Sequence, residues 1–539
     1  MEVRVSEEGV TYMGIYLNPG NEAFRISKSS EIYIDKSEMI AFTNSKLGQE
    51  KRFICVSRPR RFGKSMAANM LCAYYDRECD SKELFEGLKI AEHETFKQHL
   101  NQYDVLLLNV QQFLRKAEKP ENLTDYMEKR VLTELKETYS RLVDKEEKSL
   151  PDALAGIFAK DKTQNKGFVI IIDEWDCIFR EFREDKQAQK IYLDFLKDLL
   201  KDRTYVKMAY MTGILPIKKY GTHSALNIFD EFSMTAPKKL AEYVGFTEME
   251  VEKLCKHYGM DFEKARRWYD GYCFKQIEHV YNPKSIVDAM TEEEFQSYWT
   301  STETYEALKM YLDMNYDGLK DAIISMLGGV SYKIDIGTFQ NDMTSFHGRD
   351  DVLTLLVHLG YLAYHQEQQE VFIPNEEVRG EFLRAIKNSG WNRVVDAPSA
   401  SEKLLEETIK QNAENVAKGL DAVHTENTSI LSYNNENSLS CVITLAYFSA
   451  QKDYTLIREL PTGKGFADIV FVPRRHTNKP AIIVELKWDA SAEGAIMQIK
   501  NNQYIKALKE YNGNILLVGV NYDKKTKKHN CVIEKYHSP

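Results

Sequence analysis

Residues 53–65, which read FICVSRPRRFGKS, constrain the fold of this chain more than any other segment. The apolar run 53–56 is typical of a short buried strand, and the run 66–75 is typical of a helix. Gly63, Lys64 and Ser65 lie between the two. A phosphate-binding loop has backbone N–H groups, a lysine and a hydroxyl at this point, around the phosphates and Mg²⁺ of a nucleotide. The order strand, loop, helix therefore predicts a nucleotide site, although Arg58 stands where such loops have their first glycine.

Two later apolar runs end in polar residues that a nucleotide-hydrolysing site needs. Asp173 and Glu174 follow the run 168–172, and Thr212 follows the run 206–211. We expect Asp173 to organise the Mg²⁺ shell and Glu174 to polarise the attacking water. We expect Thr212 to sense the γ-phosphate. The alternative, in which the two acids cap a loop and Lys64 is a surface lysine, explains each residue alone but not their combination.

Strands and helices alternate through the first half of the chain. Such alternation predicts an α/β fold with a parallel sheet, helices on both faces and a ligand at the carboxyl ends of the strands. Asp35 and Ser37 follow the first predicted strand, and either can cap a helix over 38–47. The predicted strands are 32–34, 53–56, 104–110, 168–172 and 206–211.

Length, charge and cysteine content limit the class of protein. A chain of 539 residues is long enough for three or four domains. Its formal net charge of −9 argues against a protein that coats nucleic acid through a broad basic surface. The eight cysteines form no C-x-x-C pair, so we expect neither a zinc cluster nor a disulfide framework. No apolar run approaches membrane-spanning length, so we expect a soluble cytoplasmic protein without membrane contact.

A second pattern of catalytic residues lies near the end of the chain. Strand alternation over 481–487 puts Glu485 and Lys487 on one face, and the preceding predicted strand 466–472 carries Asp468. Two carboxylates on one divalent ion can position a water against a phosphodiester, and the lysine can orient that water or stabilise the developing charge. The alternative is an exposed Glu485–Lys487 ion pair worth less than about 1 kcal/mol.

A basic turn, K-K-T-K-K at 524–528, follows this pattern. It can contact a phosphate backbone, or it can be the solvated tip of a hairpin. The sequence does not decide between the two.

The middle of the chain, 245–398, is mainly helical, with amphipathic helices predicted over 248–258 and 261–269. Such a region usually forms a lid. Three aromatic residues there are predicted to pack in the core rather than to stack on bases. Helix 351–359 and a hairpin over 361–373 predict a winged-helix module, whose acidic wing favours packing over DNA binding. The three aromatic residues are Trp268, Tyr269 and Tyr272.

The segment RPRRFGKS at 58–65 resembles the signature of bacterial AAA-ATPase-like proteins that carry a C-terminal PD-(D/E)XK nuclease-superfamily domain. YIDKS at 33–37, DEWD at 173–176, TGI at 212–214, GFT at 245–247, WYDGY at 268–272 and YNP at 281–283 match further motifs of that family in the expected order. The missing first glycine is usual in the family. The resemblance implies that ATP is bound by Arg58, Pro59, Arg60, Arg61, Phe62, Gly63, Lys64, Ser65, Asp173 and Thr212, with Ser65 and Asp173 on Mg²⁺.

The same resemblance implies a nuclease site at the C-terminus. Asp468 and Glu485 match the core acids and Glu436 matches an additional metal-binding acid, while Gln498 and Tyr504 match the glutamine-containing motif. Arg58, Arg60 and Arg61 have two interpretations, either binding phosphate oxygens bidentately or facing solvent and the acids of the lid. Arg266 and Arg267 can likewise reach a nucleotide or remain solvated.

We therefore predict a P-loop parallel sheet, a helical and winged-helix middle, and a restriction-endonuclease-like α/β C-terminal domain. The predicted function is ATP binding and hydrolysis coupled to Mg²⁺-dependent cleavage of nucleic acid, catalysed by Glu174, Asp468, Glu485 and Lys487. The alternative is a nucleotide-dependent switch that binds a protein partner or a second copy of itself, with a nuclease-like fold that does not cut. The predicted segments are a lead-in (1–30), the ATPase domain (31–244), a lid (245–310), the winged-helix module (311–398) and the nuclease-like domain (399–539).

Overall fold

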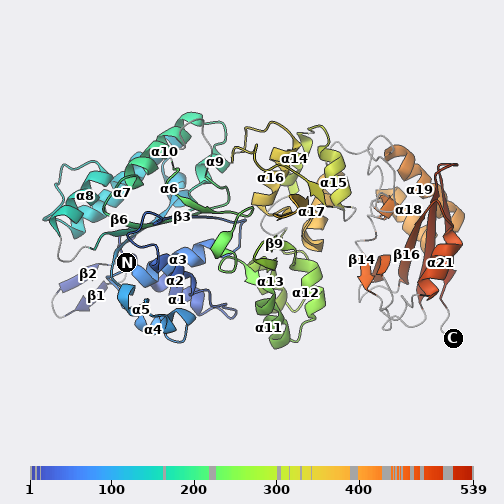
Figure 1. Ribbon diagram of the computed structural model, residues 1–539, viewed down its shortest axis with the longest axis horizontal. Helices are drawn as coiled ribbons and strands as arrows, with labels where there is room; N and C mark the ends of the chain where they lie inside the picture. Colours follow the sequence, from blue (N-terminus) through green and yellow to red (C-terminus); the bar gives the residue numbers. More distant parts are fainter. Residues whose placement is uncertain are drawn as a thin grey trace. The chain divides into compact units, whose positions relative to one another are not determined.

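The computed structural model shows two compact units (Figure 1). Unit 1 comprises Met1–Tyr298 with Lys333–Glu377, and unit 2 comprises Trp299–Tyr332 with Val378–Pro539. The residues that the structure describes are 3–6, 9–12, 14–161, 166–217, 226–299, 305–314, 316–327, 331–341, 343–388, 398–427, 439–440, 442–443, 446–447, 450, 453–461, 466–473, 479–501 and 514–536.

Unit 1 is built on a five-stranded parallel sheet with the strand order β4-β5-β6-β3-β7. Every residue of β3 and of β5 is buried, which explains why both read as continuous apolar runs. The strands are β3 (Phe53–Ser57), β4 (Asp104–Asn109), β5 (Phe168–Asp173), β6 (Val206–Gly213) and β7 (Asp230–Phe232).

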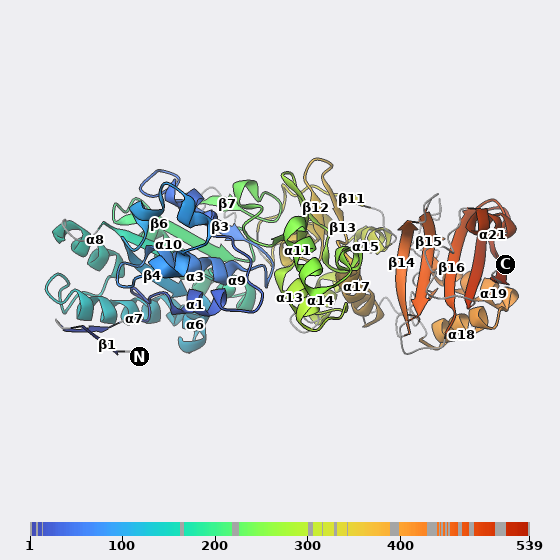
Figure 2. The same cartoon turned by 90° about the horizontal axis from the view of Figure 1, so that it is seen from below.

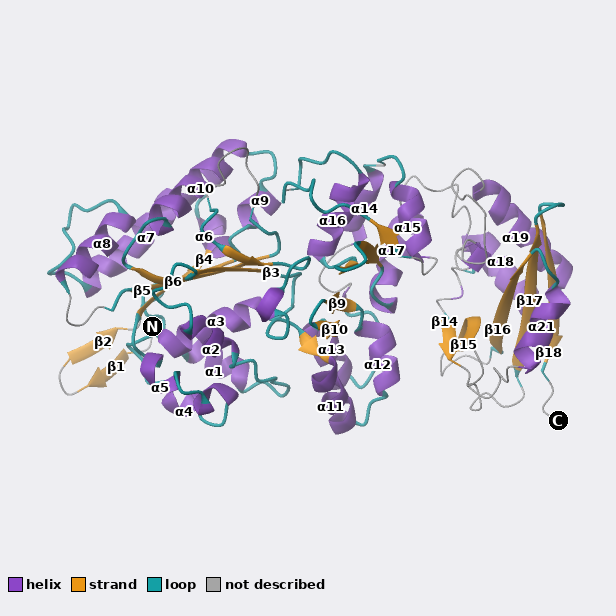
Figure 3. Ribbon diagram, viewed as in Figure 1, coloured by secondary structure: helices purple, strands orange, loops and turns teal. Residues whose placement is uncertain are grey.

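Helices cover both faces of this sheet (Figures 1 and 3). One face carries α1 (Glu22–Lys28), α2 (Met39–Asn44), α3 (Lys64–Tyr75), α4 (Lys82–Phe85) and α5 (Phe96–His99). The other carries α6 (Val110–Lys116), α7 (Leu123–Thr138), α8 (Leu150–Lys160), α9 (Cys177–Glu181) and α10 (Lys186–Leu200). The predicted α/β fold with a parallel sheet and helices on both faces is therefore confirmed. Short 3₁₀ turns occur at Lys89–Glu92, Pro120–Asn122 and Lys238–Leu240.

The start of the chain packs against this sheet. Strands β1 (Val3–Ser6) and β2 (Gly9–Tyr12) form a hairpin. Asn18 then lies along β4, where its backbone N–H donates to the Val105 carbonyl at 2.8 Å and its carboxamide nitrogen donates to Asp104 at 2.8 Å. Residues 16–18 thus extend the β4 edge of this sheet.

The strand predicted over 32–34 is wrong. Ile32 is buried and Ile34 half-buried in an apolar cluster with the helices α11 (Glu248–Tyr258) and α13 (Pro283–Thr291), so both side chains are covered without belonging to a sheet. Asp35 accepts the Ser37 N–H at 2.8 Å and the Lys89 N–H at 2.8 Å, and α2 begins at Met39. The turn before α2 therefore does more than cap a helix, because it also connects Asp35 to the segment at Lys89.

The rest of unit 1 is a smaller mixed layer. A three-stranded sheet in the order β8-β10-β9 packs with the helices α11 to α13, and helix α16 is followed by the hairpin β12–β13 as the sequence predicted. Tyr269 is buried in the apolar cluster of α11 to α13, and Trp268 packs against that cluster. Tyr272 is also buried, as expected of core aromatics. The elements are β8 (Phe246–Thr247), α11 (Glu248–Tyr258), α12 (Phe262–Tyr269), β9 (Tyr272–Phe274), β10 (Ile277–Tyr281), α13 (Pro283–Thr291), α16 (Arg349–Leu359), β12 (Ala363–His365) and β13 (Glu370–Phe372).

Unit 2 contains a mixed five-stranded sheet in the sequential order β14 to β18 (Figure 2). Strands β16 and β17 are parallel, and the other neighbours are antiparallel. Ile482, Val484 and Leu486 face the cluster that includes α18 and α19, whereas Ile483 faces α21, which confirms the predicted alternation. The strands are β14 (Tyr454–Pro461), β15 (Phe466–Pro473), β16 (Ala481–Trp488), β17 (Ile515–Asp523) and β18 (Lys528–Lys535).

In the part of the chain that the structure describes, the remaining elements are β11 and six helices. Among the described residues no helix combines the length and the apolar character needed to cross a bilayer. The bounds are α14 (Tyr305–Asp313), α15 (Leu319–Leu327), β11 (Tyr332–Lys333), α17 (Glu376–Asn388), α18 (Pro398–Ile409), α19 (Ala413–Asn427) and α21 (Ala492–Asn501).

Candidate nucleotide and metal sites

The turn between β3 and α3 forms the centre of the first site. Gly63 is the N-cap of α3 and has φ of 88°, a conformation that glycine adopts without strain. Lys64 follows it, only 4% exposed, and its Nζ donates to the Pro59 carbonyl at 2.8 Å. The lysine thus lies inside the loop, held by the carbonyl of a loop residue.

Asp173 lies at the carboxyl end of β5 and accepts hydrogen bonds from three elements. Ser65 Oγ donates to its Oδ2 at 2.8 Å, Asn109 Nδ2 donates to the same oxygen at 3.3 Å, and Thr212 Oγ1 donates to Oδ1. The structure therefore brings together Ser65, Asp173 and Thr212 as the sequence predicted. A serine hydroxyl beside an aspartate is an oxygen donor set suited to Mg²⁺.

Glu174 is held by an arginine. Arg180, from α9, donates to Glu174 Oε2 and, through Nε, to Asp176 Oδ2 at 3.1 Å. Asp176 Oδ2 also accepts the backbone N–H groups of Ile214 at 3.0 Å and Leu215 at 2.8 Å, which ties α9 to the end of β6. The carboxylate predicted to activate water is thus paired with a cation from its own segment.

A cavity of about 500 Å³ opens between these groups. Two of its lining residues, Arg61 with φ of 66° and Glu174 with φ of 55°, adopt a left-handed backbone although they are not glycines. Such strain costs free energy and clusters at functional sites. The lining comprises Arg60, Arg61, Gly63, Lys64, Ser65, Met66, Gln111, Arg115, Glu174 and Arg180.

Burial shifts the pKa values of charged residues at this cavity. Desolvation lowers the pKa of Lys64, against the opposing effect of the carboxylates of Glu174, Asp173 and Asp176. Desolvation raises the pKa of Glu174, and the nearby Arg180 and Lys64 oppose that rise. Because each shift is opposed by neighbouring opposite charges, the acids and cations of this cavity depend on one another for their charged forms.

The three arginines of the loop separate into two groups. Arg60 and Arg61 are exposed and line the cavity. Arg58 is 0% exposed, and its guanidinium donates to the carbonyls of Ser57 at 2.9 Å and Phe232 at 2.8 Å and lies over the Phe274 ring. The phosphate-contacting role predicted for Arg58 is corrected here, because its side chain is buried between strands and outside the cavity lining.

Two other predicted loop residues act through packing. The Pro59 carbonyl accepts from Lys64, and Phe62 is buried with its ring edge-on to Tyr272 at a centroid separation of 5.2 Å. In the region predicted to form a lid, the Arg266 guanidinium lies 3.7 Å from both Glu248 and Asp270. Arg266 is thus placed among acids of its own region.

The second site lies on the β15–β16 pair of unit 2. Ile469 pairs with Val484, a register that puts Asp468 opposite Glu485 on neighbouring antiparallel strands. Asp468 Oδ2 accepts the Leu486 N–H at 2.7 Å, and Lys487 Nζ lies 3.4 Å from Glu485 Oε1. The structure therefore brings the predicted Asp-Glu-Lys set to one place.

Glu485 has a buried oxygen that finds no partner. The residue is only 1% exposed, and Oε2 makes no hydrogen bond to any of the described residues. Burial, followed by the nearby Asp468 charge, raises the pKa of Glu485 to about 7. A buried carboxylate oxygen without a donor, beside a second carboxylate, fits a divalent cation, because a cation replaces both the missing partner and the charge compensation.

Gln498 lies on α21, partly buried, and Glu436 and Tyr504 lie outside the described residues. Their predicted roles stay predictions. Sequence reasoning missed Arg180, Asn109, Gln111 and Arg115 around the first site.

Some of these could have been found. Asn109 ends an apolar strand just as Asp173 does, which is the signal that identified Asp173. Gln111 and Arg115 reach the cavity only because β4 is the neighbour of β5, and strand order cannot be read from a sequence.

Two family models match segments of the chain. Residues 20–222 match the family model described as predicted AAA-ATPase, and residues 434–531 match the model of the PD-(D/E)XK nuclease superfamily. No curated protein matches the chain.

Three solved structures are similar at low identity. The Walker-type ATPase of Pyrococcus abyssi is 11% identical, with 64% of this chain and 94% of that chain covered and a TM-score of 0.35. The ORC2 protein of Aeropyrum pernix is 10% identical, with 68% and 94% covered and a TM-score of 0.22. Cdc6p of Pyrobaculum aerophilum is 9% identical, with 68% and 98% covered and a TM-score of 0.21. Scores this low carry no functional argument.

The family models and the two sites fall on the same segments. The residues around Lys64 and Asp173 lie within the first match, and Asp468, Glu485 and Lys487 lie within the second. The chain therefore carries one segment that matches the AAA-ATPase-like model and another that matches the model of the PD-(D/E)XK nuclease superfamily.

Proposed function

We propose that unit 1 binds and hydrolyses ATP with Mg²⁺, and that the C-terminal domain of unit 2 cleaves phosphodiester bonds of nucleic acid with a divalent metal ion. The observation that carries the proposal is the same in both units. A lysine and a pair of acids come together in each: Lys64 with Asp173 and Glu174 beside the cavity of unit 1, and Lys487 with Asp468 and Glu485, whose buried Oε2 has no partner among the described residues.

In the ATPase site, different residues bind the phosphates, hold the metal and activate the water. Lys64 Nζ exchanges the Pro59 carbonyl for a phosphate oxygen, and the backbone N–H groups at the start of α3 bind the same phosphates. Ser65 and Asp173 hold Mg²⁺, which when bound neutralises charge on the phosphates. Glu174 accepts the proton of the attacking water, and Arg180 keeps that carboxylate ionised and oriented.

In the nuclease site, Asp468 and Glu485 hold the metal, which when bound lowers the pKa of a water and polarises the phosphate. The Leu486 N–H fixes Asp468 on the opposite strand. Lys487 lies beside Glu485, where its ammonium can orient the nucleophilic water or stabilise the charge that develops on the phosphate.

We also propose that the protein is located in the cytoplasm. Within the described part of the chain, seven cysteines are free thiols. Free thiols are typical of a reducing compartment, where disulfides rarely persist.

The competing function is a nucleotide-dependent switch that does not cut. The net charge of −9 favours it, because a polyanion is repelled by an acidic protein unless local basic groups attract it. The two functions differ only in whether the second site turns over substrate.

Nucleotide binding is tested by unfolding the full-length protein with and without MgATP. At about a hundred times its dissociation constant, MgATP stabilises the binding domain by about 2.7 kcal/mol. Lys64→Ala should abolish this shift. Lys51→Ala, which removes an exposed lysine before β3, should keep it. No shift in the wild type would contradict the ATPase half.

Cleavage is tested with labelled DNA and RNA in Mg²⁺ or Mn²⁺. Glu485→Gln should stop cleavage, whereas Glu402→Gln, which changes an exposed acid of α18, should not. Metal binding without cleavage of any tested polynucleotide would support the switch instead.

A further inference from the structure

A row of polar side chains continues from the nuclease site across the sheet. The parallel register pairs Lys487 with Asn521 on β17, and the antiparallel register pairs Asn521 with Asn530 on β18. Residues paired in this way point to the same face, here the face that carries α21. The row therefore spans about 10 Å from β16 to β18, at about 4.8 Å for each strand.

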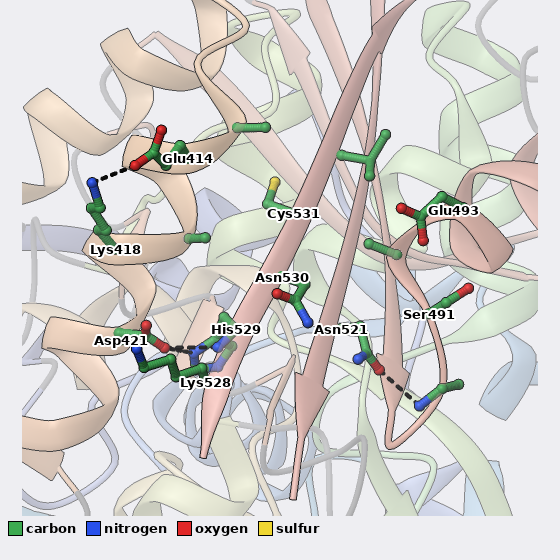
Figure 4. Close-up of a pocket in the computed structure, with 15 residues that line it drawn as sticks. Glu414, Lys418, Asp421, Ser491, Glu493, Asn521, Lys528, His529, Asn530 and Cys531 are labelled. Atoms are coloured by element: carbon green, nitrogen blue, oxygen red, sulfur yellow. Dashed lines mark hydrogen bonds and ion pairs between the residues drawn. The ribbon is translucent and has the colours of Figure 1, made fainter. Parts of the chain in front are cut away.

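Asn521 contributes a carboxamide to this row. It is 3% exposed, and its Oδ1 accepts the Ala490 N–H at 2.9 Å, which identifies the oxygen of the carboxamide. Its Nδ2 makes no hydrogen bond to any described residue. Figure 4 shows this side chain between the start of α21 and Asn530, in the lining of a cavity of about 520 Å³.

The acids of α19 around this cavity have partners. Glu414 forms an ion pair with Lys418 at 2.6 Å, and Asp421 accepts the His529 backbone N–H at 2.7 Å and lies 2.8 Å from His529 Nδ1 (Figure 4). Glu493 is an exposed acid at the first turn of α21. Lys528 lies on the opposite side of the cavity, at the start of β18.

The turn that leads into Lys528 is strongly basic. Lys524, Lys525, Lys527 and Lys528 are all exposed, and none of their ammonium groups forms an ion pair with a described residue. Asp523 is used within the turn, where its Oδ1 accepts the N–H groups of Lys525 at 2.7 Å and Thr526 at 3.0 Å. The tip is therefore a fixed hairpin that presents four lysines within five residues.

We propose that this surface, made of the lysine tip 524–528 and the cavity at Asn521, binds the phosphate backbone of the nucleic acid beside the scissile bond. The inference rests on the proposed nuclease function and names the surface that holds its substrate. Asn521 Nδ2 donates to a phosphate oxygen one strand away from Lys487, and the lysines bind the phosphates that follow. A row of donors ending in clustered lysines fits a repeating polyanion better than a single small anion.

The test measures binding separately from cleavage. In a Glu485→Gln background, the affinity for a labelled 30-nucleotide duplex and for a single strand is measured by fluorescence anisotropy over a range of salt concentrations. Three changes are compared: Lys524, Lys525 and Lys527 all to Ala, Lys528→Ala, and Lys535→Ala. Lys535 is an exposed lysine at the far end of the same strand, so it is the matched control.

The lysine triple variant should bind at least about tenfold more weakly at low salt. The slope of its affinity against salt concentration should fall by about 0.9 for each duplex phosphate that the variant no longer neutralises. Lys528→Ala should weaken binding and Lys535→Ala should not. In otherwise wild-type protein, the triple variant should raise KM and leave kcat unchanged. Asn521→Asp keeps the acceptor for Ala490 but replaces the donor with a charge, so it should also raise KM.

Two results would overturn the inference and are distinguishable. If the wild type cleaves nucleic acid but the triple variant matches Lys535→Ala in affinity and salt slope, the substrate is held elsewhere and the nuclease function stands. If the wild type neither binds nor cleaves either probe, the nuclease function fails and the inference fails with it.

Discussion

The two sites contain similar residues but differ in their hydrogen bonding: the key polar groups of the first site already have partners in the protein, and one in the second site does not. In unit 1, Asp173 accepts from three side chains and Lys64 is held by a carbonyl of its own loop. In unit 2, a buried oxygen of Glu485 has no donor among the described residues. The first site must exchange internal bonds to bind its ligand, whereas the second gains a missing partner. Similar groups therefore predict different responses to mutation.

The largest expected effect tests the catalytic part of the first site. Glu174→Gln should lower ATP hydrolysis by about 10²–10⁴-fold, because it removes a general base, while ATP affinity stays nearly constant. Steady-state hydrolysis and equilibrium binding measure the two quantities. Glu184→Gln, an exposed acid of the following turn, is the control. A loss of hydrolysis below about tenfold would remove Glu174 from this role.

The second effect concerns the unsatisfied oxygen. Glu485→Gln should weaken Mn²⁺ binding to nucleotide-free protein by at least about 10–100-fold, since a neutral amide cannot replace a carboxylate ligand. Isothermal titration calorimetry measures this loss. Equal affinity in Glu485→Gln and in Glu402→Gln, which changes an exposed acid of α18, would show that the metal lies elsewhere.

The free energy of unfolding, measured without ligands, should also respond differently to mutations in the two sites. Asp173→Asn should destabilise the protein by about 1–3 kcal/mol, because three donors lose a charged acceptor. Glu485→Gln should leave stability unchanged or raise it, because it removes a buried charge that lacks a donor. Urea unfolding in EDTA compares them. Similar losses in both variants would contradict the contrast drawn here.

The smallest expected effect is a loss of folding stability at acidic pH, caused by His424 in unit 2. Burial, followed by the neighbouring His529, lowers the pKa of His424 to about 4, while Asp421 acts in the opposite direction. The unfolded chain binds this proton below about pH 6.5, so stability should fall as pH drops, by about 1 kcal/mol at pH 5.5. Urea unfolding at several pH values measures the slope. His424→Phe replaces one aromatic ring beside Tyr522 with another and should reduce the slope, while His529, whose pKa is also lowered by burial, keeps part of it.

Much of the architecture could be predicted because it depends on local pattern. The buried strands of unit 1 read as apolar runs, and the alternation in β16 placed Glu485 and Lys487 on one face. The segment 32–34 failed because its apolar side chains pack against helices, and an apolar run alone does not distinguish that from a strand.

The residues that sequence could not place depend on neighbours distant in the chain. Arg58 reads like the other loop arginines, and only the position of β7 and β9 shows that it is buried. Arg180 lies six residues after Glu174 and could equally have faced solvent. Its role follows from the position of α9 against the end of β6, which buries it beside two acids.

The central claim is that one chain holds two separate phosphate-handling centres. The most direct measurement assays ATP hydrolysis and nucleic-acid cleavage in parallel for the wild type, Lys64→Ala and Glu485→Gln. We predict that Lys64→Ala loses hydrolysis and that Glu485→Gln loses cleavage while it still hydrolyses ATP. Cleavage that persists in Glu485→Gln, or hydrolysis that persists in Lys64→Ala, would contradict the account.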